Sequence, residues 1–183
     1  MARVPYLSKA DLAPDDRELL DNDINLRRAL VNSPKAARAS SHLMRFMRSE
    51  SRLDPRLREM AILQVAYLAR APYEYVHHIE LAHKAGVSDA EIRAIANDTI
   101  GRDTMLDPLT RAVLRAAREM TRKAELSDET FAPLKKELDA ERIVDLFYIV
   151  SHYIGVVRLL AALQIEVEEK YRHYLEEFPL PAG

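Results

Sequence analysis

The sequence contains no cysteine, and this absence excludes several kinds of chemistry at once. Disulfides, thiolate metal ligands and a peroxidatic thiol all require cysteine sulfur. Glycine is also scarce, with four in 183 residues, which leaves little material for the tight turns of β-hairpins. Alanine, leucine, arginine and glutamate dominate instead. This composition favours an all-α fold.

The chain also lacks a large excess of charge of one sign and a long apolar run. Its net charge is −2 and its pI is near 6.3, so nothing indicates a nucleic-acid partner. The longest run without a charged side chain, residues 146–157, is too short to span a bilayer. Residues 1–6 lack the apolar stretch of a signal peptide. We therefore expect a cytoplasmic protein without a membrane partner.

What remains is a composition typical of one folded domain. Apolar residues make up 48% of the chain and charged residues 31%, which excludes a disordered protein. A chain of 183 residues is long enough to bury a substantial core. We predict a single helical domain over residues 1–183.

Helix start signals divide the chain clearly. Asp54-Pro55 and Asp107-Pro108 each combine an N-cap residue with proline at the first helical position. Ser88 to Glu91 forms a capping box that follows the helix stop at Gly86. The predicted helices span residues 15–32, 35–50, 55–70, 73–85, 89–97, 108–124, 128–138 and 141–175.

The segment 143–163 is rich in β-branched and aromatic residues but keeps helical spacing of its apolar positions. We predict that it is the central buried helix, within a long C-terminal helix over residues 141–175. Residues 166–177 are strongly charged, and we expect that part to face solvent.

Glu59, Glu74 and His78 are the candidate catalytic residues. Glu74 and His78 are four apart and would share one face of a helix. Glu59 lies one predicted helix earlier, with apolar neighbours on both sides, where an unpaired buried carboxylate is costly. Glu59 and Glu74 could instead be surface carboxylates paired with a neighbour, and His78 could be a half-buried histidine that donates to a carbonyl. If they converge, two carboxylates and an imidazole could perform acid–base chemistry or bind a metal.

The spacing of these residues resembles that of the carboxymuconolactone decarboxylase family, which includes the alkylhydroperoxidase D proteins. In the peroxidase branch the pattern is Glu, eleven residues, Cys-x-x-Cys, three residues, His. Glu59 and His78 match its ends without a gap, whereas Ala71 and Glu74 stand at the two cysteine positions. The similarity is densest over residues 54–95 and extends over most of the chain.

The resemblance implies an alkylhydroperoxidase D-like bundle of about eight helices that forms dimers, trimers or hexamers, with the site near a subunit contact. It implies an acid–base lyase, of the decarboxylase or isomerase type, acting on a small unsaturated lactone or carboxylic acid. His78 would be the acid–base group, Glu59 would orient it, and Glu74 would be a second such group. The alternatives are a relative that has lost thiol peroxidase activity and a non-enzymatic oligomeric scaffold.

Four further residues are candidates for substrate binding: Tyr73, His152, Tyr153 and Arg158. Aromatic residues on helices more often belong to the core, so each of the first three has a structural alternative. Arg158 could bind a substrate carboxylate through two hydrogen bonds or merely pair with an acidic neighbour.

A metal site is the other interpretation of the Glu and His residues. Glu59, Glu74 and His78, with His152 or His77, would suit zinc, iron or manganese. A Glu-x-x-x-His pair on one helix is common, however, and the sequence has no second clear ligand pair. We therefore predict a site without a metal or cofactor, and we expect His77 to be a packing or interface residue.

Overall fold

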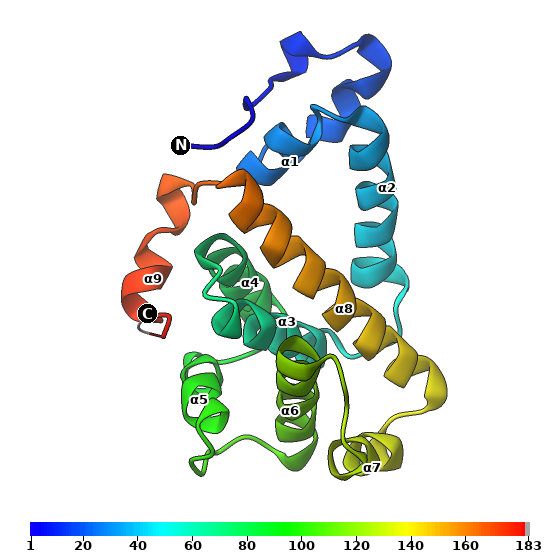
Figure 1. Ribbon diagram of the computed structural model, residues 1–183, viewed down its shortest axis with the longest axis vertical. Coiled ribbons are helices and arrows are strands. Elements are labelled where there is room, and N and C mark those ends of the chain that lie inside the picture. Colours follow the sequence, from blue (N-terminus) through cyan, green and yellow to red (C-terminus); the bar gives the residue numbers. More distant parts are fainter. Residues whose placement is uncertain (182–183) are drawn as a thin grey trace.

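The computed structural model describes residues 1–181, which form helices and no strands (Figure 1). The all-α class is confirmed. The α-helices are α1 (Asn25–Leu30), α2 (Pro34–Arg45), α3 (Pro55–Leu68), α4 (Pro72–Lys84), α5 (Asp89–Thr99), α6 (Pro108–Lys123), α7 (Asp128–Glu137), α8 (Ala140–Leu163) and α9 (His173–Glu177). The shorter segments are the 3-10 helices η1 (Lys9–Asp11), η2 (Pro14–Leu20) and η4 (Glu169–Tyr171), and one π-helical turn, η3 (Phe46–Glu50).

Helix α3 is the centre of the fold. Every residue from Glu59 to Ala66 is buried, because α3 packs against α4, α6 and α8. The prediction that residues 143–163 form the central helix was wrong. Helix α8 buries one face against α3 and leaves Val144, Tyr148 and Leu159 exposed on another.

The predicted helix starts are confirmed by their capping hydrogen bonds. The Asp54 carboxylate accepts from the first turn of α3, and Asp107 accepts from the backbone N–H of Thr110 in α6. The capping box of Ser88 and Glu91 opens α5. These local interactions set the beginnings of the three helices, and the predicted spans of α3 to α7 are correct within two residues.

Two predicted helices near the N-terminus are wrong in extent. Residues 15–32 form the 3-10 helix η2 and then α1, separated by residues 21–24. Three of these four are Asp or Asn, whose short polar side chains compete with helical hydrogen bonding. The predicted helix 35–50 is α-helical only to Arg45 and continues as the π-helical turn η3.

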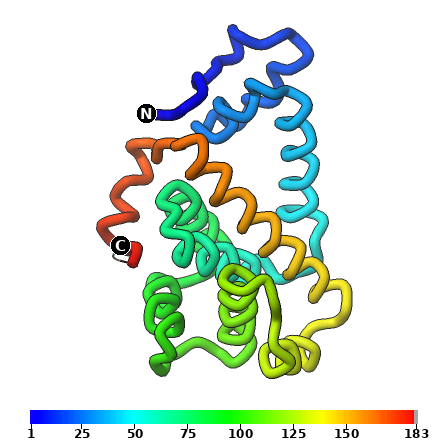
Figure 2. Tube along the Cα trace, in the orientation of Figure 1, coloured from blue at the N-terminus to red at the C-terminus, as the bar shows by residue number. Residues whose placement is uncertain are grey.

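The long helix predicted over residues 141–175 is also wrong. Helix α8 ends at Leu163 because Gln164 adopts a left-handed backbone conformation, with φ of 53°, and Ile165 turns into the core. The following segment does not simply face solvent. It runs beside α4 through η4 and α9, and ends with Phe178 in the core (Figure 2).

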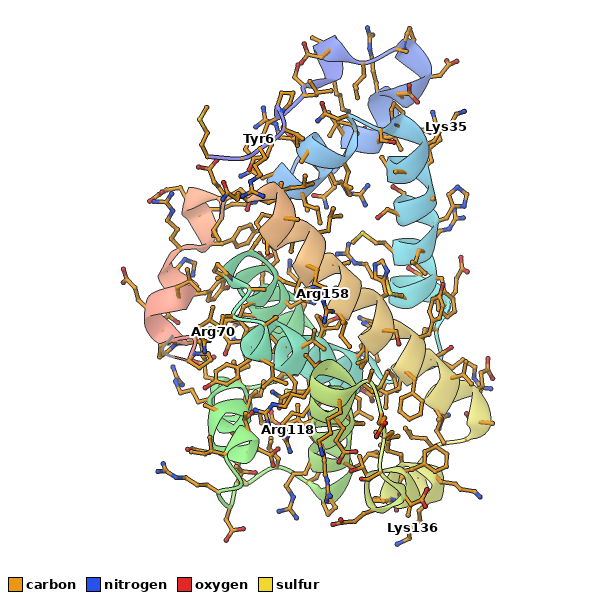
Figure 3. All side chains as sticks on the ribbon, in the orientation of Figure 1. Tyr6, Lys35, Arg70, Arg118, Lys136 and Arg158 are labelled. Carbon is orange, nitrogen blue, oxygen red and sulfur yellow. The ribbon has the colours of Figure 1, made fainter. Side chains whose placement is uncertain are left out.

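The N-terminal segment is joined to the end of α8. The backbone N–H of Arg3 donates to the carbonyl of Leu163 over 2.9 Å, and the N–H of Glu166 donates to the Tyr6 hydroxyl over 3.0 Å. Figure 3 shows Tyr6 beside this end of α8. The N-terminal segment and the residues that follow α8 therefore lie together at one end of the bundle.

Helix α8 has the length and apolar composition of a membrane span, which the length of its charge-free run did not indicate. The core helices of many soluble proteins have the same properties, so this is weak evidence for a membrane. Only 33% of its most apolar window is buried within the chain. Helix α8 therefore presents apolar surface that the protomer does not cover.

We predict that Gln164→Gly stabilises the protein. A left-handed conformation costs a non-glycine residue about 1–2 kcal/mol, and the flexibility of glycine costs about 0.5–1 kcal/mol, so a net gain of about 0.5–1 kcal/mol is expected. Denaturant unfolding measures it. Ala132→Gly at an exposed position inside α7 is the control and should destabilise. A loss of stability in Gln164→Gly would contradict the assigned end of α8.

Candidate active site

The candidate site lies where α3 and α4 pack together. The chain reverses between these helices at Arg70, whose φ is 48°, and Pro72 begins α4. This turn brings the second turn of α3 opposite the first two turns of α4. Glu59 projects from α3, and Glu74 and His78 project from α4, so all three side chains meet inside the protein.

The imidazole of His78 is held between two carboxylates. Its Nδ1 lies 2.6 Å from Oε2 of Glu59, and its Nε2 lies 2.8 Å from Oε1 of Glu74. The exposed fraction of each residue is small: 2% for Glu59, 5% for Glu74 and 4% for His78. The predicted convergence of these three residues is confirmed, although their roles stay predictions.

Arg58 completes the charge balance of the buried group. Its Nε donates to Oε1 of Glu59 over 2.9 Å, and its Nη1 donates to the carbonyl of Met47 over 3.0 Å. With His78 protonated, two positive groups face two carboxylates. Such compensation is needed because an unpaired buried charge is strongly destabilising.

The carboxylates determine the protonation of His78. Burial by itself would lower the pKa of His78, but the Glu59 and Glu74 carboxylates outweigh it and raise that pKa to about 9. Burial also acts to raise the pKa of Glu59, yet the charges of His78 and Arg58 prevail and lower it. At neutral pH His78 is therefore an imidazolium that donates from Nδ1 to Glu59 and forms an ion pair with Glu74 through Nε2.

A cavity of about 390 Å³ lies on one side of this group, bounded by α1, α2, α4, α8 and η4. Glu74 and His78 are part of its wall, whereas Glu59 lines a smaller cavity of about 200 Å³. His78 thus connects two carboxylates that reach different cavities. Much of the larger wall is apolar, with Ile24, Leu26, Leu30, Met44 and Val156 among its residues.

Three of the four predicted substrate-binding residues line the larger cavity. Tyr73 and Tyr153 are buried in its wall, and His152 is half-buried there. The ring of Tyr153 packs edge-on against His78, with centroids 4.9 Å apart. Burial, together with the charges of Glu74 and Glu59, raises the pKa of Tyr153, so its hydroxyl stays protonated.

Arg158 is the exception. It is exposed on α8 (Figure 3), lies outside the cavity wall, and donates to the carbonyl of Ile154 in its own helix over 2.7 Å. The place expected for Arg158 is taken by Arg48 of η3, which lines both cavities. Nothing in the sequence distinguished Arg48, because its position depends on the π-helical turn.

His77 and Glu168 were not predicted as site residues. Oε2 of Glu168 accepts from Nε2 of His77 over 2.8 Å, and Oε1 accepts from the backbone N–H of Asn25 over 2.7 Å. The His77 ring lies between Tyr73 and Tyr171, with centroids 4.4 and 4.2 Å away. His77 therefore packs, as predicted, but it also forms part of the cavity wall. The sequence holds no signal for a contact that joins residues so far apart.

The two positions that carry cysteine in the peroxidase pattern have different places here. Ala71 is buried just before α4, and Glu74 lies one turn inside α4 on the cavity wall. Among residues 1–181, no group of three or more His, Asp or Glu residues is placed to hold a metal ion. Both ring nitrogens of His78 are already occupied by carboxylate oxygens.

Comparisons with known proteins agree with this fold. The profile of the carboxymuconolactone decarboxylase family matches residues 34–119. No curated protein matches the chain significantly. An alkylhydroperoxidase AhpD core structure, an uncharacterized peroxidase-related protein from Ralstonia eutropha JMP134, superposes with a TM-score of 0.80. The two are 18% identical, and the match covers 98% of each chain.

Two other solved structures share the fold. A peroxidase-related protein from Silicibacter sp. TM1040 has a TM-score of 0.67, is 19% identical, and is matched over 93% of this chain and 97% of its own. A cysteine-to-alanine variant of the debrominase Bmp8, in complex with 2,3,4-tribromopyrrole, has a TM-score of 0.79 and is 21% identical, with 97% and 98% covered. Residues 34–119 are thus similar to the carboxymuconolactone decarboxylase family, and the chain, which has no cysteine, has an AhpD-like fold.

Proposed function

We propose that this protein is an acid–base catalyst that transfers protons on a small unsaturated lactone or carboxylic acid. The observation that carries the proposal is His78, bound at both ring nitrogens by buried carboxylates beside a largely apolar cavity. Titratable groups with strongly shifted pKa values beside a cavity are typical of active sites. An isomerisation needs only such proton transfers, and a decarboxylation needs one after the C–C bond has broken and CO2 has left, when the carbon takes up a proton.

The connected carboxylates support a defined route for the proton. His78 holds a proton at neutral pH and can pass it through Nε2 to Glu74, which reaches the substrate cavity. Glu59 holds the other ring nitrogen and reaches the smaller cavity, from which the proton can be replaced. Glu74 is thus the group that acts on the substrate, and His78 is its proton store.

Unpaired arginines support an anionic substrate. Whereas Arg56 and Arg58 are ion-paired, no carboxylate pairs with Arg48 or Arg27 within residues 1–181. Nε of Arg27 is buried without a hydrogen-bond partner, and burial together with the nearby charge of Arg48 lowers the pKa of Arg27. A ligand with an apolar body and one carboxylate would fill the cavity and pair with Arg48.

Thiol peroxidase activity does not fit this chain, because no sulfur stands at Ala71, Glu74 or elsewhere as a thiol. The fold neighbour that binds 2,3,4-tribromopyrrole holds a small planar ring compound. That likeness supports a small-molecule ligand of similar size here. The type of reaction is inferred from this chain's own side chains.

We predict that His78→Gln and Glu74→Gln each lower turnover by roughly 10²–10⁴-fold, the usual contribution of an acid–base group. The assay is a screen of unsaturated lactones and of β-keto and vinylogous acids, followed by product formation and solvent-deuterium uptake. Arg48→Gln should raise KM and leave kcat nearly unchanged, because it removes substrate binding.

The control for this screen is His42→Gln, at an exposed histidine of α2 outside the cavity wall. It should keep full activity. Turnover that survives both His78→Gln and Glu74→Gln would overturn the proposed site. Activity removed by a chelator and restored by one added metal would replace proton transfer with metal catalysis.

We predict that stability falls between about pH 6.5 and pH 9. The pKa of His78 is about 9 in the folded protein and near 6.5 when unfolded, so its contribution is complete below pH 6.5 and is lost as the pH rises through 9. Glu59 has the opposite pH dependence. Because its pKa is lowered in the folded protein, it stabilises the fold above about pH 4.5, and this stabilisation is lost in acid.

Thermal unfolding against pH measures both effects. The decline above pH 6.5 should disappear in His78→Gln and persist in His42→Gln. If His78→Gln does not fold, NMR titration of the wild-type imidazole signals gives the same information, with a midpoint near 9 expected. A histidine set that titrates entirely below pH 7 would contradict the assigned ion pairs.

Self-association is the second part of the proposal, and the exposed face of α8 supports it. Val144, Tyr148 and Leu159 are large exposed apolar residues on this helix, and Ser151 and Gly155 leave the same face open between them. The spacing of three to four residues places them in one stripe. A second copy that covers this stripe would bury apolar surface the protomer leaves in water.

We predict that Gly155→Arg dissociates the oligomer. A Cβ at Gly155 would meet no atom within 4 Å in the protomer, so only a partner would obstruct a larger side chain. Sedimentation should show the wild type well above 20.9 kDa and the variant near it. Ala132→Arg, on the exposed side of α7, should leave the oligomer intact. A wild-type protein that sediments as a monomer would end this prediction.

A further inference from the structure

His152 is an unpartnered imidazole on the wall of the larger cavity. It lies in the middle of α8, is half-buried, and forms no hydrogen bond through its ring within residues 1–181. Its nitrogens are not among the enclosed atoms that lack a partner, which are Nε of Arg27 and Oγ1 of Thr104. The ring nitrogens of His152 are therefore not fully enclosed, and the residue lines the cavity.

His152 and His78 pack against the same aromatic ring. Both imidazoles pack edge-on against the ring of Tyr153, with centroid distances of 5.5 Å for His152 and 4.9 Å for His78. His78 approaches from α4 and His152 belongs to α8, so the two histidines reach the cavity from different elements. A small ligand in this cavity would contact both histidines.

The environments of the two histidines are opposite. Burial lowers the pKa of His152, and the more distant Glu74 carboxylate only partly offsets this. The paired carboxylates raise the pKa of His78 to about 9. The other titratable or charged side chains of the wall are Arg48 of η3, Tyr153 of α8, Tyr171 of η4, and Tyr73, Glu74, His77, Glu80 and Lys84 of α4. At neutral pH His152 is therefore a neutral imidazole and His78 an imidazolium, which are the states of a base and an acid.

We propose that His152 is the catalytic base of this cavity and that the reaction is a proton shift from the α8 side to the α4 side. The inference rests on the proposed acid–base function and narrows it to the isomerisation of a β,γ-unsaturated acid or lactone. His152 would contact the reacting carbon, and Glu74 would contact the other end of the conjugated system.

The step balances without a further reactant. A ring nitrogen of His152 takes the proton from the carbon next to the carboxyl or lactone carbonyl. The electron pair of that C–H bond forms the new double bond, and the old double bond takes up a proton at its far carbon from Glu74, which receives it from His78. His152 then carries the proton that His78 has lost, and exchange with water restores both.

The first test uses the protein alone. NMR titration of the imidazole signals, assigned with His152→Gln and His78→Gln, should show His152 losing its proton well below pH 7 while His78 keeps its own. A His152 that is protonated at pH 7 would overturn the inference and leave the acid role of Glu74 and His78 standing.

The second test uses vinylacetate, a small β,γ-unsaturated carboxylate, in deuterated water. Wild-type protein should incorporate deuterium next to the carboxylate and form the conjugated isomer. His152→Gln should lose both by about 100-fold or more, as expected on removing a general base. Glu74→Gln should retain exchange next to the carboxylate but lose the isomer, because only the second proton transfer is removed.

The controls separate a chemical role from a structural one. Added imidazole should restore exchange to His152→Gly, which a loss of packing would not allow. If His152→Gln exchanges and isomerises at near wild-type rates while Glu74→Gln no longer forms the isomer, His152 is not the base and the proposed function survives. If wild-type protein catalyses neither exchange nor isomerisation, the proposed function and this inference both fail.

Discussion

The burial of one imidazole between two carboxylates is the interaction on which the candidate site depends. His78 is stable inside the protein only because Glu59 and Glu74 compensate its charge at 2.6 and 2.8 Å, and Glu59 in turn is paired with Arg58. Removing one member would leave a buried charge without a partner, which typically costs about 3–5 kcal/mol. The same arrangement that stabilises the α3–α4 contact therefore stores a proton beside the cavity.

The helices around this group determine what the stored proton can reach. Helix α3 is buried from Glu59 to Ala66 and supplies one carboxylate, while α8 supplies Tyr153 and His152 to the wall of the larger cavity. The segment after α8 closes the cavity through Tyr171 and binds His77 through Glu168. The proposed acid–base chemistry would depend on this packing, because small displacements of an acid–base group cost much of its effect.

Much of the fold could be predicted from local signals. Asp54, Ser88 and Asp107 cap their helices as predicted, since a capping side chain contacts backbone only two or three residues away. The convergence of Glu59, Glu74 and His78 followed from helix spacing and from the family pattern. The prediction of a long C-terminal helix was wrong because α8 ends at the left-handed backbone of Gln164. A glutamine does not by itself indicate such a conformation.

The sequence by itself determined the helical class, most helix starts, the absence of thiol chemistry and the three candidate catalytic residues Glu59, Glu74 and His78. These follow from residue types and from contacts between neighbours along the chain. Only the tertiary structure showed that Arg48 lines the cavity in place of Arg158, that Glu168 binds His77, and that α3 is the central helix. Such contacts join residues far apart in the chain, and the packing of whole helices decides them, because no short-range pattern encodes which faces meet.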